Sequence, residues 1–369
     1  MWGRLIYKIE RRKETMKQKY LLIILSFLLL NLCPLCGIKV YAEEGIRIDE
    51  TNFPDSIFRT NISNADKDKN GILSKEEIEG ITVIYFDGGD YTGYQKLQSL
   101  KGIEFLTNLK TLYLNSTGVK SIDLNKNSNL VKIKVTNQII QEFKLPESSK
   151  LSILETFNSQ FPSIDFSGQP ELKQVSLSVR GETIDFSKNR KLESVMLTGM
   201  VTEGSIVSKC TKHISQVKTV IIGDNDKIKS LKCDLPKLSK LDIGKTPALN
   251  YVSINNSKRL KSLNTDKMTN LKQLEVVNCG LTRLKLTKNK KLEKLNCSKN
   301  KLKKLSVTKN IKLKLLKCSN NKISILNLKK NKNLKTLSCK KNKIRKIDIQ
   351  KTKLKRKNIK CDKKVIIIK

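Results

Sequence analysis

The sequence predicts a β-rich solenoid: short parallel strands in coils of about 21 residues, with little helix, behind a small helical N-terminal cap. Three observations lead to this fold class. A pattern L-x-x-L-x-C/V/L recurs through residues 81–369. Its last two apolar positions lie two residues apart, which is the period of one face of a strand. The repeat period is too short for a full helix in each coil, so stacked coils must share one core.

The coils are placed by the recurring pattern. Twelve starts are found, at Ile81, Leu109, Leu130, Leu151, Leu172, Leu192, Ile228, Leu249, Leu271, Leu292, Leu313 and Leu334, and a truncated thirteenth coil begins near Leu354. Most neighbouring starts are evenly spaced along the chain. The second half of each coil repeats the alternation, as at Leu302, Leu305 and Val307. A second extended segment is therefore expected on the opposite side of each coil.

Cysteine recurs at a position that the pattern assigns to the core. Cys297, Cys318 and Cys339 take the second inward position of their strands, as do Cys233 and Cys361. A free thiol behaves as a small apolar group and is among the most buried side chains. Disulfides or a metal site are the alternative, but one thiol per coil lacks the close C-x-x-C spacing of metal ligands. A structural role in the core is therefore favoured.

The pattern resembles the leucine-rich repeat family over nearly the whole chain after residue 80. The resemblance implies that Asn300, Asn321 and Asn342, three residues after the cysteines, satisfy backbone groups where the chain leaves each strand. Cys279 takes the same place one coil earlier. The domain expected from this resemblance is a solenoid over residues 81–369.

One coil is longer than the others. The starts at Leu192 and Ile228 are much farther apart than their neighbours, which indicates an insertion near 202–216. The insertion holds Cys210 and the only histidine, His213. A Cys–His pair can form a nucleophile, but no third group that would orient the pair is readable. A surface excursion is favoured, and with one histidine and no convergent acidic pair the chain is predicted not to be an enzyme.

Residues 66–77 match the calcium-loop pattern D-x-[DN]-x-[DN]-G-x5-E at every position. The segment resembles a single EF-hand loop, which implies one Ca²⁺ ion. Its ligands would come from Asp66, Asp68, Asn70, Ile72, Ser74 and Glu77. The alternative is a metal-free turn in which Ser74 and Glu77 form a capping box at a helix start. The loop lies in a helical cap predicted over residues 43–80, which would cover the apolar end of the first coil.

The first 42 residues predict a signal peptide. A basic segment at 16–20 precedes an apolar run at 21–35, and cleavage is expected after Ala42, with Met16 as an alternative start. An uncleaved membrane anchor is the alternative; after cleavage no membrane segment is expected. Signal, ion loop and cysteine-bearing repeats together resemble secreted or surface leucine-rich repeat proteins of Gram-positive bacteria, internalin-like in style. The resemblance implies recognition of a protein or glycan ligand by a secreted or loosely surface-associated protein.

The strand register predicts which side chains meet a partner on the concave face. Large apolar groups at outward positions are candidate anchors: Tyr113, Ile153, Phe157, Met196 and Tyr251.

The charge distribution supports an alternative function. The net charge is +40, and residues 271–369 hold 34 bases and 4 acids, whereas residues 43–80 hold 5 bases and 10 acids. The lysine-rich C-terminal half could bind anionic wall polymers or sulfated glycans, or it is simply a solvated surface. Specific nucleic-acid binding is not predicted, because the sequence gives no sign of base readout.

Overall fold

The computed structural model divides the chain into two units, residues 1–44 and Gly45–Lys369. The structure describes residues 45–88, 96–147, 149–178, 180–202, 211–213 and 215–369, all in the second unit. The predicted signal peptide lies outside the described residues. No helix in these described ranges is both long and apolar enough to cross a membrane.

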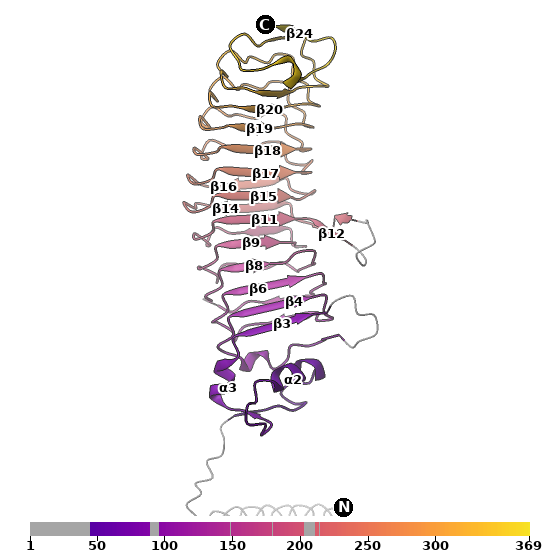
Figure 1. The fold of residues 1–369 in the computed structure, drawn as a ribbon, viewed down its shortest axis with the longest axis vertical. Helices are drawn as coiled ribbons and strands as arrows, with labels where there is room; N and C mark the ends of the chain where they lie inside the picture. Colours follow the sequence, from indigo (N-terminus) through magenta and orange to yellow (C-terminus); the bar gives the residue numbers. More distant parts are fainter. Residues whose placement is uncertain (1–44, 89–95, 148, 179, 203–210, 214) are drawn as a thin grey trace, which may run out of the picture. The chain divides into compact units, whose positions relative to one another are not determined.

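The second unit begins with a small cap (Figure 1). Strand β1 (Ile46–Arg47) pairs antiparallel with β2 (Ile72–Leu73). The short helix α2 (Ser56–Ser63) lies between these strands in the sequence, and a second short helix, α3 (Lys75–Gly80), comes after β2. Helix α2 starts at Ser56 because the Asp55 carboxylate accepts the N–H groups of Ile57 and Phe58. Phe53 and Phe58 are fully buried and meet edge-to-face, so the cap has an aromatic core.

A parallel sheet of 13 strands forms one layer of the solenoid, with one strand from each coil. In spatial order its strands are β3 (Val83–Asp87), β4 (Thr111–Asn115), β6 (Lys132–Thr136), β8 (Ile153–Glu155), β9 (Gln174–Leu177), β11 (Ser194–Thr198), β15 (Ser230–Asp234), β17 (Tyr251–Asn255), β18 (Gln273–Val277), β19 (Lys294–Asn296), β20 (Leu315–Lys317), β21 (Thr336–Ser338) and β23 (Ile359–Lys360). The register is unbroken from Ile84 to Ile359, so equivalent residues of successive coils form straight rows.

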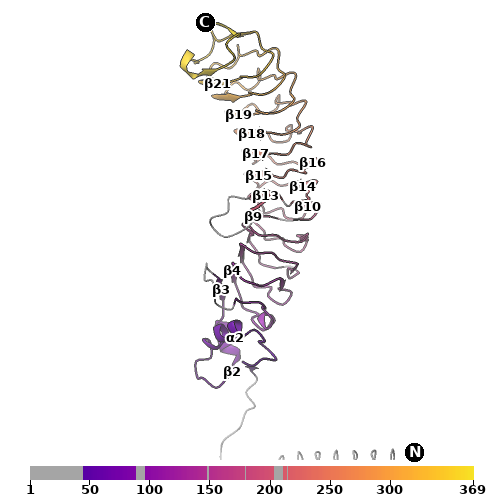
Figure 2. The ribbon, with the colours of Figure 1, turned by 90° about the vertical axis from the view of Figure 1, so that its right-hand side faces the viewer.

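The second half of each coil forms a thinner layer on the opposite side, which Figure 2 shows edge-on. Its strands are β5 (Ser121–Asp123), β7 (Glu142–Lys144), β10 (Thr183–Asp185), β14 (Thr219–Gly223), β16 (Lys240–Ile243), β22 (Lys346–Asp348) and β24 (Ile366–Ile368). They pair in parallel within three small sheets. Two 3-10 turns, η1 (Ile103–Phe105) and η2 (Arg356–Asn358), lie outside these sheets. The predicted fold class, a parallel β-solenoid of short regular coils with little helix, is confirmed.

The core lies between the two layers, and the cysteines are part of it. Cys297, Cys318 and Cys339 are at most 1% exposed, and Cys233 is 2% exposed. All four thiols are free, as are those of Cys279 and Cys361. The prediction that these cysteines are inward-facing core residues is confirmed, and Cys361 is half-buried in the last coil.

The insertion near 202–216 and the start of the last coil are the two places where the structure adds detail to the predicted pattern. Between β11 and β14 the chain forms a hairpin of β12 (Met200–Thr202) and β13 (Thr211–His213), which pair antiparallel. The thirteenth coil starts later than Leu354. Leu337 follows its own coil start by three positions, whereas its register partner Ile359 follows Leu354 by five. The η2 turn takes up the additional length before β23.

Candidate functional site

The outward face of the 13-stranded sheet, here called the strand face, is the larger of two candidate sites. It corresponds to the predicted concave face. Its central row runs in register from Tyr85 through Tyr113, Lys134 and Glu155 to Ser176 and onward. Because alternate residues of each strand point inward, only every second side chain contributes to this face.

Buried amides hold the strands of this face in place. Asn321 donates from Nδ2 to the carbonyls of Cys297 at 2.9 Å and Cys318 at 3.0 Å, and its Oδ1 accepts the N–H of Leu302 at 3.0 Å. Asn300 and Asn342 make the equivalent bonds to their own neighbouring coils. Each amide therefore satisfies backbone groups of two coils, as the resemblance implied, and fixes the spacing of the strands.

Aromatic side chains gather at the N-terminal end of the strand face. The Tyr85 and Tyr113 rings stack with centroids 4.4 Å apart and an interplanar angle of 8°. Lys134 Nζ lies 5.3 Å from the Tyr113 ring centroid on the other side. Tyr85 is 56% exposed, and Val83, two residues away on the same face, is 55% exposed. Burial, together with the Asp87 carboxylate and Tyr113, raises the pKa of Tyr85, so its phenol stays neutral at physiological pH.

The structure places the five predicted anchors unequally. Phe157 is 61% exposed at the corner that follows β8. Tyr113, Ile153, Met196 and Tyr251 face outward but are half-buried, so the expectation that all five stand in water is only partly met. The physical reason is the close spacing of the rows: Tyr113 is covered by Tyr85 and Lys134, and Lys232 Nζ lies 5.5 Å from the Tyr251 ring.

Sequence reasoning missed two strongly exposed residues of this surface, Val83 and Tyr85. The coil start at Ile81 was found, and it places Tyr85 in the same row as Tyr113. The alignment therefore contained the signal. The alignment did not show that the Tyr85 and Tyr113 rings stack, because that contact depends on how strands β3 and β4 pair.

The strand face carries far less charge than the chain as a whole. Its outward strand positions hold six lysines (Lys132, Lys134, Lys232, Lys294, Lys317 and Lys360) and four acids (Asp87, Glu155, Asp234 and Glu275). The excess of lysine in the chain thus lies elsewhere, on turns and on the second layer. A nearly balanced face with exposed aromatic groups is suited to a protein surface.

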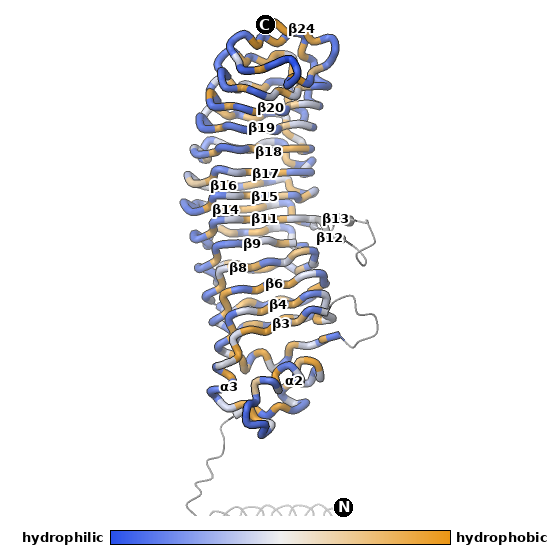
Figure 3. The backbone as a smooth tube through the Cα atoms, in the orientation of Figure 1, coloured by the Kyte–Doolittle hydropathy of each residue, from blue (hydrophilic) through white to orange (hydrophobic). Residues whose placement is uncertain are grey.

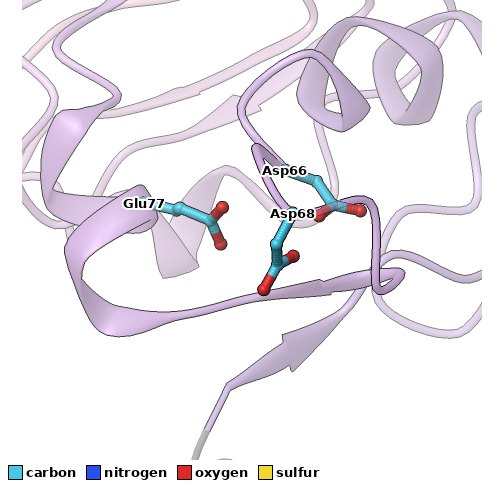
Figure 4. A group of neighbouring side chains, drawn as sticks. All are labelled: Asp66, Asp68 and Glu77. Carbon is cyan, nitrogen blue, oxygen red and sulfur yellow. The ribbon is translucent and has the colours of Figure 1, made fainter.

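The second candidate site is the acidic loop between α2 and α3. One oxygen each from Asp66, Asp68 and Glu77 lies within 4.8 Å of the other two. Figure 4 shows the three carboxylates near one another, two from the loop and one from α3. Glu77 is only 9% exposed, and none of the three forms an ion pair with a lysine or arginine in the described part of the chain.

Backbone groups hold the loop in this shape. Gly71 and Lys69 have positive φ values of 79° and 59°, which tighten the turn. Asp66 accepts the N–H groups of Asn70 at 3.1 Å and Gly71 at 2.9 Å. Desolvation raises the pKa of Asp66, but these bonds outweigh it and the pKa is lowered. The pKa of Glu77 is lowered by the N–H groups of Lys67 and Ser74, so both carboxylates stay ionised.

The metal-free alternative is also present in this loop. Ser74 and Glu77 form a full capping box at the start of α3, with Ser74 N to Glu77 Oε2 at 2.9 Å and Glu77 N to Ser74 Oγ at 3.3 Å. Asn70 Oδ1 accepts the N–H of Ile72 at 2.7 Å. A carboxylate has about four acceptor sites, so these bonds leave lone pairs for a cation. The donor set, hard oxygens with three negative charges, fits a divalent ion such as Ca²⁺.

The side chains of the two catalytic candidates, Cys210 and His213, are not among those that the structure describes. Cys210 lies outside the described residues, and of His213 only the backbone is described, in β13. That the chain is not an enzyme stays a prediction.

Comparison with known proteins identifies the fold. No protein-family model matches the chain, and no curated protein matches it. Among solved structures it is similar to the functional domain of InlJ from Listeria monocytogenes, with a TM-score of 0.54 and 21% identity over 87% of this chain and 63% of that one. The fold is an internalin-like leucine-rich repeat. An internalin from L. monocytogenes strain 4b F2365, InlF, has a TM-score of 0.50 and 19% identity over 89% of this chain and 98% of its own.

The buried cysteines can be compared with those of the InlJ domain. The InlJ domain is described as including a cysteine ladder. In the present chain Cys297, Cys318 and Cys339 form buried rungs in three successive coils. The chain spans 63% of the length of the InlJ domain.

Proposed function

We propose that this internalin-like chain recognises a macromolecular partner, most simply a protein, through the N-terminal half of its strand face. The observation that carries the proposal is the Tyr85–Tyr113 stack, with Tyr85 56% exposed beside Val83. Rings held rigidly at a surface lose little entropy when they bind, which is why aromatic residues are frequent hot spots. Lys134 and Glu155, next in the row, supply charges of both signs at its border.

The proposal is tested with fluorescently labelled protein on cultured epithelial cells and on purified Gram-positive cell walls, at increasing salt. Screening weakens exposed charge contacts but leaves desolvated apolar contacts largely intact. Saturable binding is expected to survive high salt. It should fall at least about 10-fold in a Tyr85→Ala/Tyr113→Ala variant, because a hot spot contributes about 2 kcal/mol or more.

A matched control lies at the other end of the same face. Lys294→Ala/Thr336→Ala removes two outward side chains from the first positions of their strands and changes no aromatic residue. This variant should bind like the wild type. If binding disappears at high salt whether or not the tyrosines are present, the lysines account for the affinity, and the proposal is overturned.

We also propose that the acidic loop binds one Ca²⁺ ion that stabilises the cap. The support is the convergence of Asp66, Asp68 and Glu77 and the absence of a neutralising ion pair among the described residues. When bound, the ion would neutralise the mutual repulsion of the three carboxylates. Extracellular calcium sites of this kind have dissociation constants of about 10⁻⁴–10⁻³ M.

Calorimetric titration with Ca²⁺ and thermal unfolding with and without the ion test this second proposal. Millimolar Ca²⁺ is expected to raise the Tm of the wild type and of Glu76→Gln, an exposed neighbour on α3. It should not raise the Tm of Asp66→Asn or Asp68→Asn. Equal shifts in all four proteins would show that the ion acts elsewhere, and no shift in any would leave the loop a metal-free capping turn.

These two proposals suit a protein outside the cell. We propose a secreted or loosely surface-associated protein of a Gram-positive-type bacterium, because internalin-like folds and a calcium loop of low expected affinity both fit an exterior rich in calcium.

A further inference from the structure

A column of lysines follows the turns that precede the strands in the last coils. Five of these turns share one geometry: the N–H of the fourth residue donates to the carbonyl of the first. The five bonds are Met268 to Thr265, Asn289 to Leu286, Asn310 to Val307, Asn331 to Leu328 and Thr352 to Ile349, at 2.8–3.1 Å. The third residue of every turn is an exposed lysine. These five residues, here called the turn ladder, are Lys267, Lys288, Lys309, Lys330 and Lys351.

Four of the five turns of the ladder are bonded directly to one another, which aligns their lysines. Asn289 Nδ2 donates to the Met268 carbonyl at 2.9 Å, Asn310 to Asn289 at 2.8 Å, and Asn331 to Asn310 at 2.9 Å. These amides are at most 1% exposed. With a separation of about 4.8 Å between neighbouring strands, the five lysines cover roughly 20 Å along the stacking direction.

The charge of the turn ladder is not neutralised within the chain. Among the described residues, the 34 bases of residues 271–369 form only two ion pairs, Lys285 with Asp266 and Lys314 with Glu293, and Lys267 forms none. Neither involves a member of the ladder. The residue that follows the turn is also an exposed lysine in three of the five coils (Lys290, Lys332 and Lys353), whereas Thr269 and Ile311 take this place in the other two. In Figure 3 the upper turns along the edge where the strands begin are correspondingly hydrophilic.

Such an arrangement has no benefit for the fold itself. The third position of a turn accepts almost any residue, and aligned like charges repel one another. A linear polyanion laid along the column would instead meet one positive charge per coil. Its counterions would be released on binding, which favours association.

The chemistry of the column selects among polyanions. It contains lysine only, and a lysine ammonium binds phosphate as a point charge without the planar geometry of arginine. Residues 271–369 contain no Phe, Tyr or Trp, so no ring is present on which a base or a sugar could stack. A phosphodiester chain with one charge per repeat matches a single column better than a glycan with clustered sulfates.

We propose that the turn ladder binds a linear phosphodiester polymer without bases, aligned with the stack of coils. This surface lies at the strand starts of the C-terminal coils and is separate from the aromatic end of the strand face. The inference therefore does not depend on the proposed protein partner.

The test uses poly(glycerol phosphate) as the probe, with affinity measured by calorimetry over a series of salt concentrations. The ladder variant is Lys288→Gln/Lys309→Gln/Lys330→Gln. Its matched control is Lys301→Gln/Lys322→Gln/Lys343→Gln. The control residues are also exposed, lie in the same or the adjoining coils and bond to the preceding coil through their N–H groups. Both variants lose the same charge, and circular dichroism checks that both fold.

The ladder variant is expected to bind the probe at least about 10-fold more weakly. The slope of log affinity against log salt should fall by about 2, since each single-strand phosphate contact contributes about 0.7. The control should lose less than about 3-fold. Equal losses in the two variants would show that only net charge matters and would overturn the ladder. Heparin or single-stranded DNA binding as tightly as the probe would overturn the assignment to a phosphodiester polymer without bases.

Discussion

Asp55 Oδ2 accepts the backbone N–H of Gln98 at 2.7 Å, across 43 residues of sequence. The same oxygen accepts the N–H of Ser99 at 3.1 Å, while Oδ1 caps α2 through Ile57 and Phe58. One carboxylate therefore joins the first helix of the cap to the segment that leads into η1 and β4. The cap and the solenoid depend on each other through this group.

Asp55→Ala should lower the free energy of unfolding by about 2 kcal/mol, because a helix N-cap contributes about 1 kcal/mol and the bonds to Gln98 and Ser99 are lost as well. Asp55→Asn keeps one acceptor oxygen and should cost less. Urea unfolding measures both. Glu147→Gln, which removes an exposed carboxylate from the solenoid, is the control and should be neutral. A neutral Asp55→Ala variant would contradict the proposed coupling.

The contribution of Asp55 should depend on pH. Desolvation raises its pKa, but the four N–H donors outweigh this effect, so the pKa in the folded state is below the ordinary value of 3.8. A lowered folded pKa means that the stabilisation is present in full above the unfolded pKa and is lost as the pH falls through the folded pKa. The stability difference between wild type and Asp55→Asn should therefore be constant from pH 5 to 7 and shrink below about pH 4. An increase on acidification would contradict this sign.

The hydrogen bonds of the Asn321 side chain predict that substitutions at this position lower the free energy of unfolding by different amounts. Asn321→Ala leaves the buried N–H of Leu302 and the carbonyl of Cys297 without their partner, and should cost about 2–4 kcal/mol. Asn321→Cys should be milder, because Cys279 occupies the equivalent place and its Sγ lies 3.5 Å from the carbonyls of Ile254 and Val277. Chemical denaturation ranks the variants. A cysteine variant less stable than the alanine variant would contradict the equivalence.

Backbone conformation makes Lys341 a site for stabilisation. Its φ of 56° lies in the left-handed region, where Asn256, Asn278 and Asn320 stand in other coils. Asparagine adopts this region more readily than lysine. Lys341→Asn should raise the free energy of unfolding by about 0.5–1 kcal/mol. Lys340→Asn, which makes the same change in charge beside it, should have no effect, and equal gains in both would indicate that charge, not conformation, is responsible.

The buried thiols should resist alkylation in the folded protein. Burial raises the pKa of Cys297 and Cys339 to about 12 and that of Cys318 well above 9. At pH 8 only about one thiol in 10⁴ with a pKa of 12 is ionised, and the thiolate is the reactive form. Mass spectrometry after iodoacetamide treatment should show Cys361 modified first and the other three only after unfolding in urea. Rapid labelling of Cys318 without urea would contradict its burial.

Most of the solenoid could be predicted from the sequence because each coil repeats the same physical requirement. The pattern at Leu292, Leu295 and Cys297 places three side chains in one core, and the regular period carries this to Leu313 and Leu334. The predicted coil starts agree with the strand register from β3 to β21. The late start of β23 was missed, because a 3-10 turn leaves no mark on an apolar pattern.

The sites were less predictable because they depend on contacts between rows. Sequence alone places Tyr113 outward, but its partial burial follows from Tyr85 and Lys134 on the two neighbouring strands. In the acidic loop, the motif predicted both outcomes, and the structure contains features of both: convergent carboxylates at Asp66 and Asp68, and a capping box at Ser74 and Glu77.

The uniform length of the C-terminal coils has an evolutionary consequence. From Leu271 to Leu334 the coil starts are equally spaced. The buried asparagines of the turns, such as Asn310 and Asn331, donate side-chain hydrogen bonds only to the preceding coil. Duplication or loss of one such segment in the gene would keep every strand in register and preserve the core. It would also add or remove one lysine of the turn ladder. The reach of the molecule and the length of polymer it can hold could therefore change together, in single genetic steps, without a new fold having to be found.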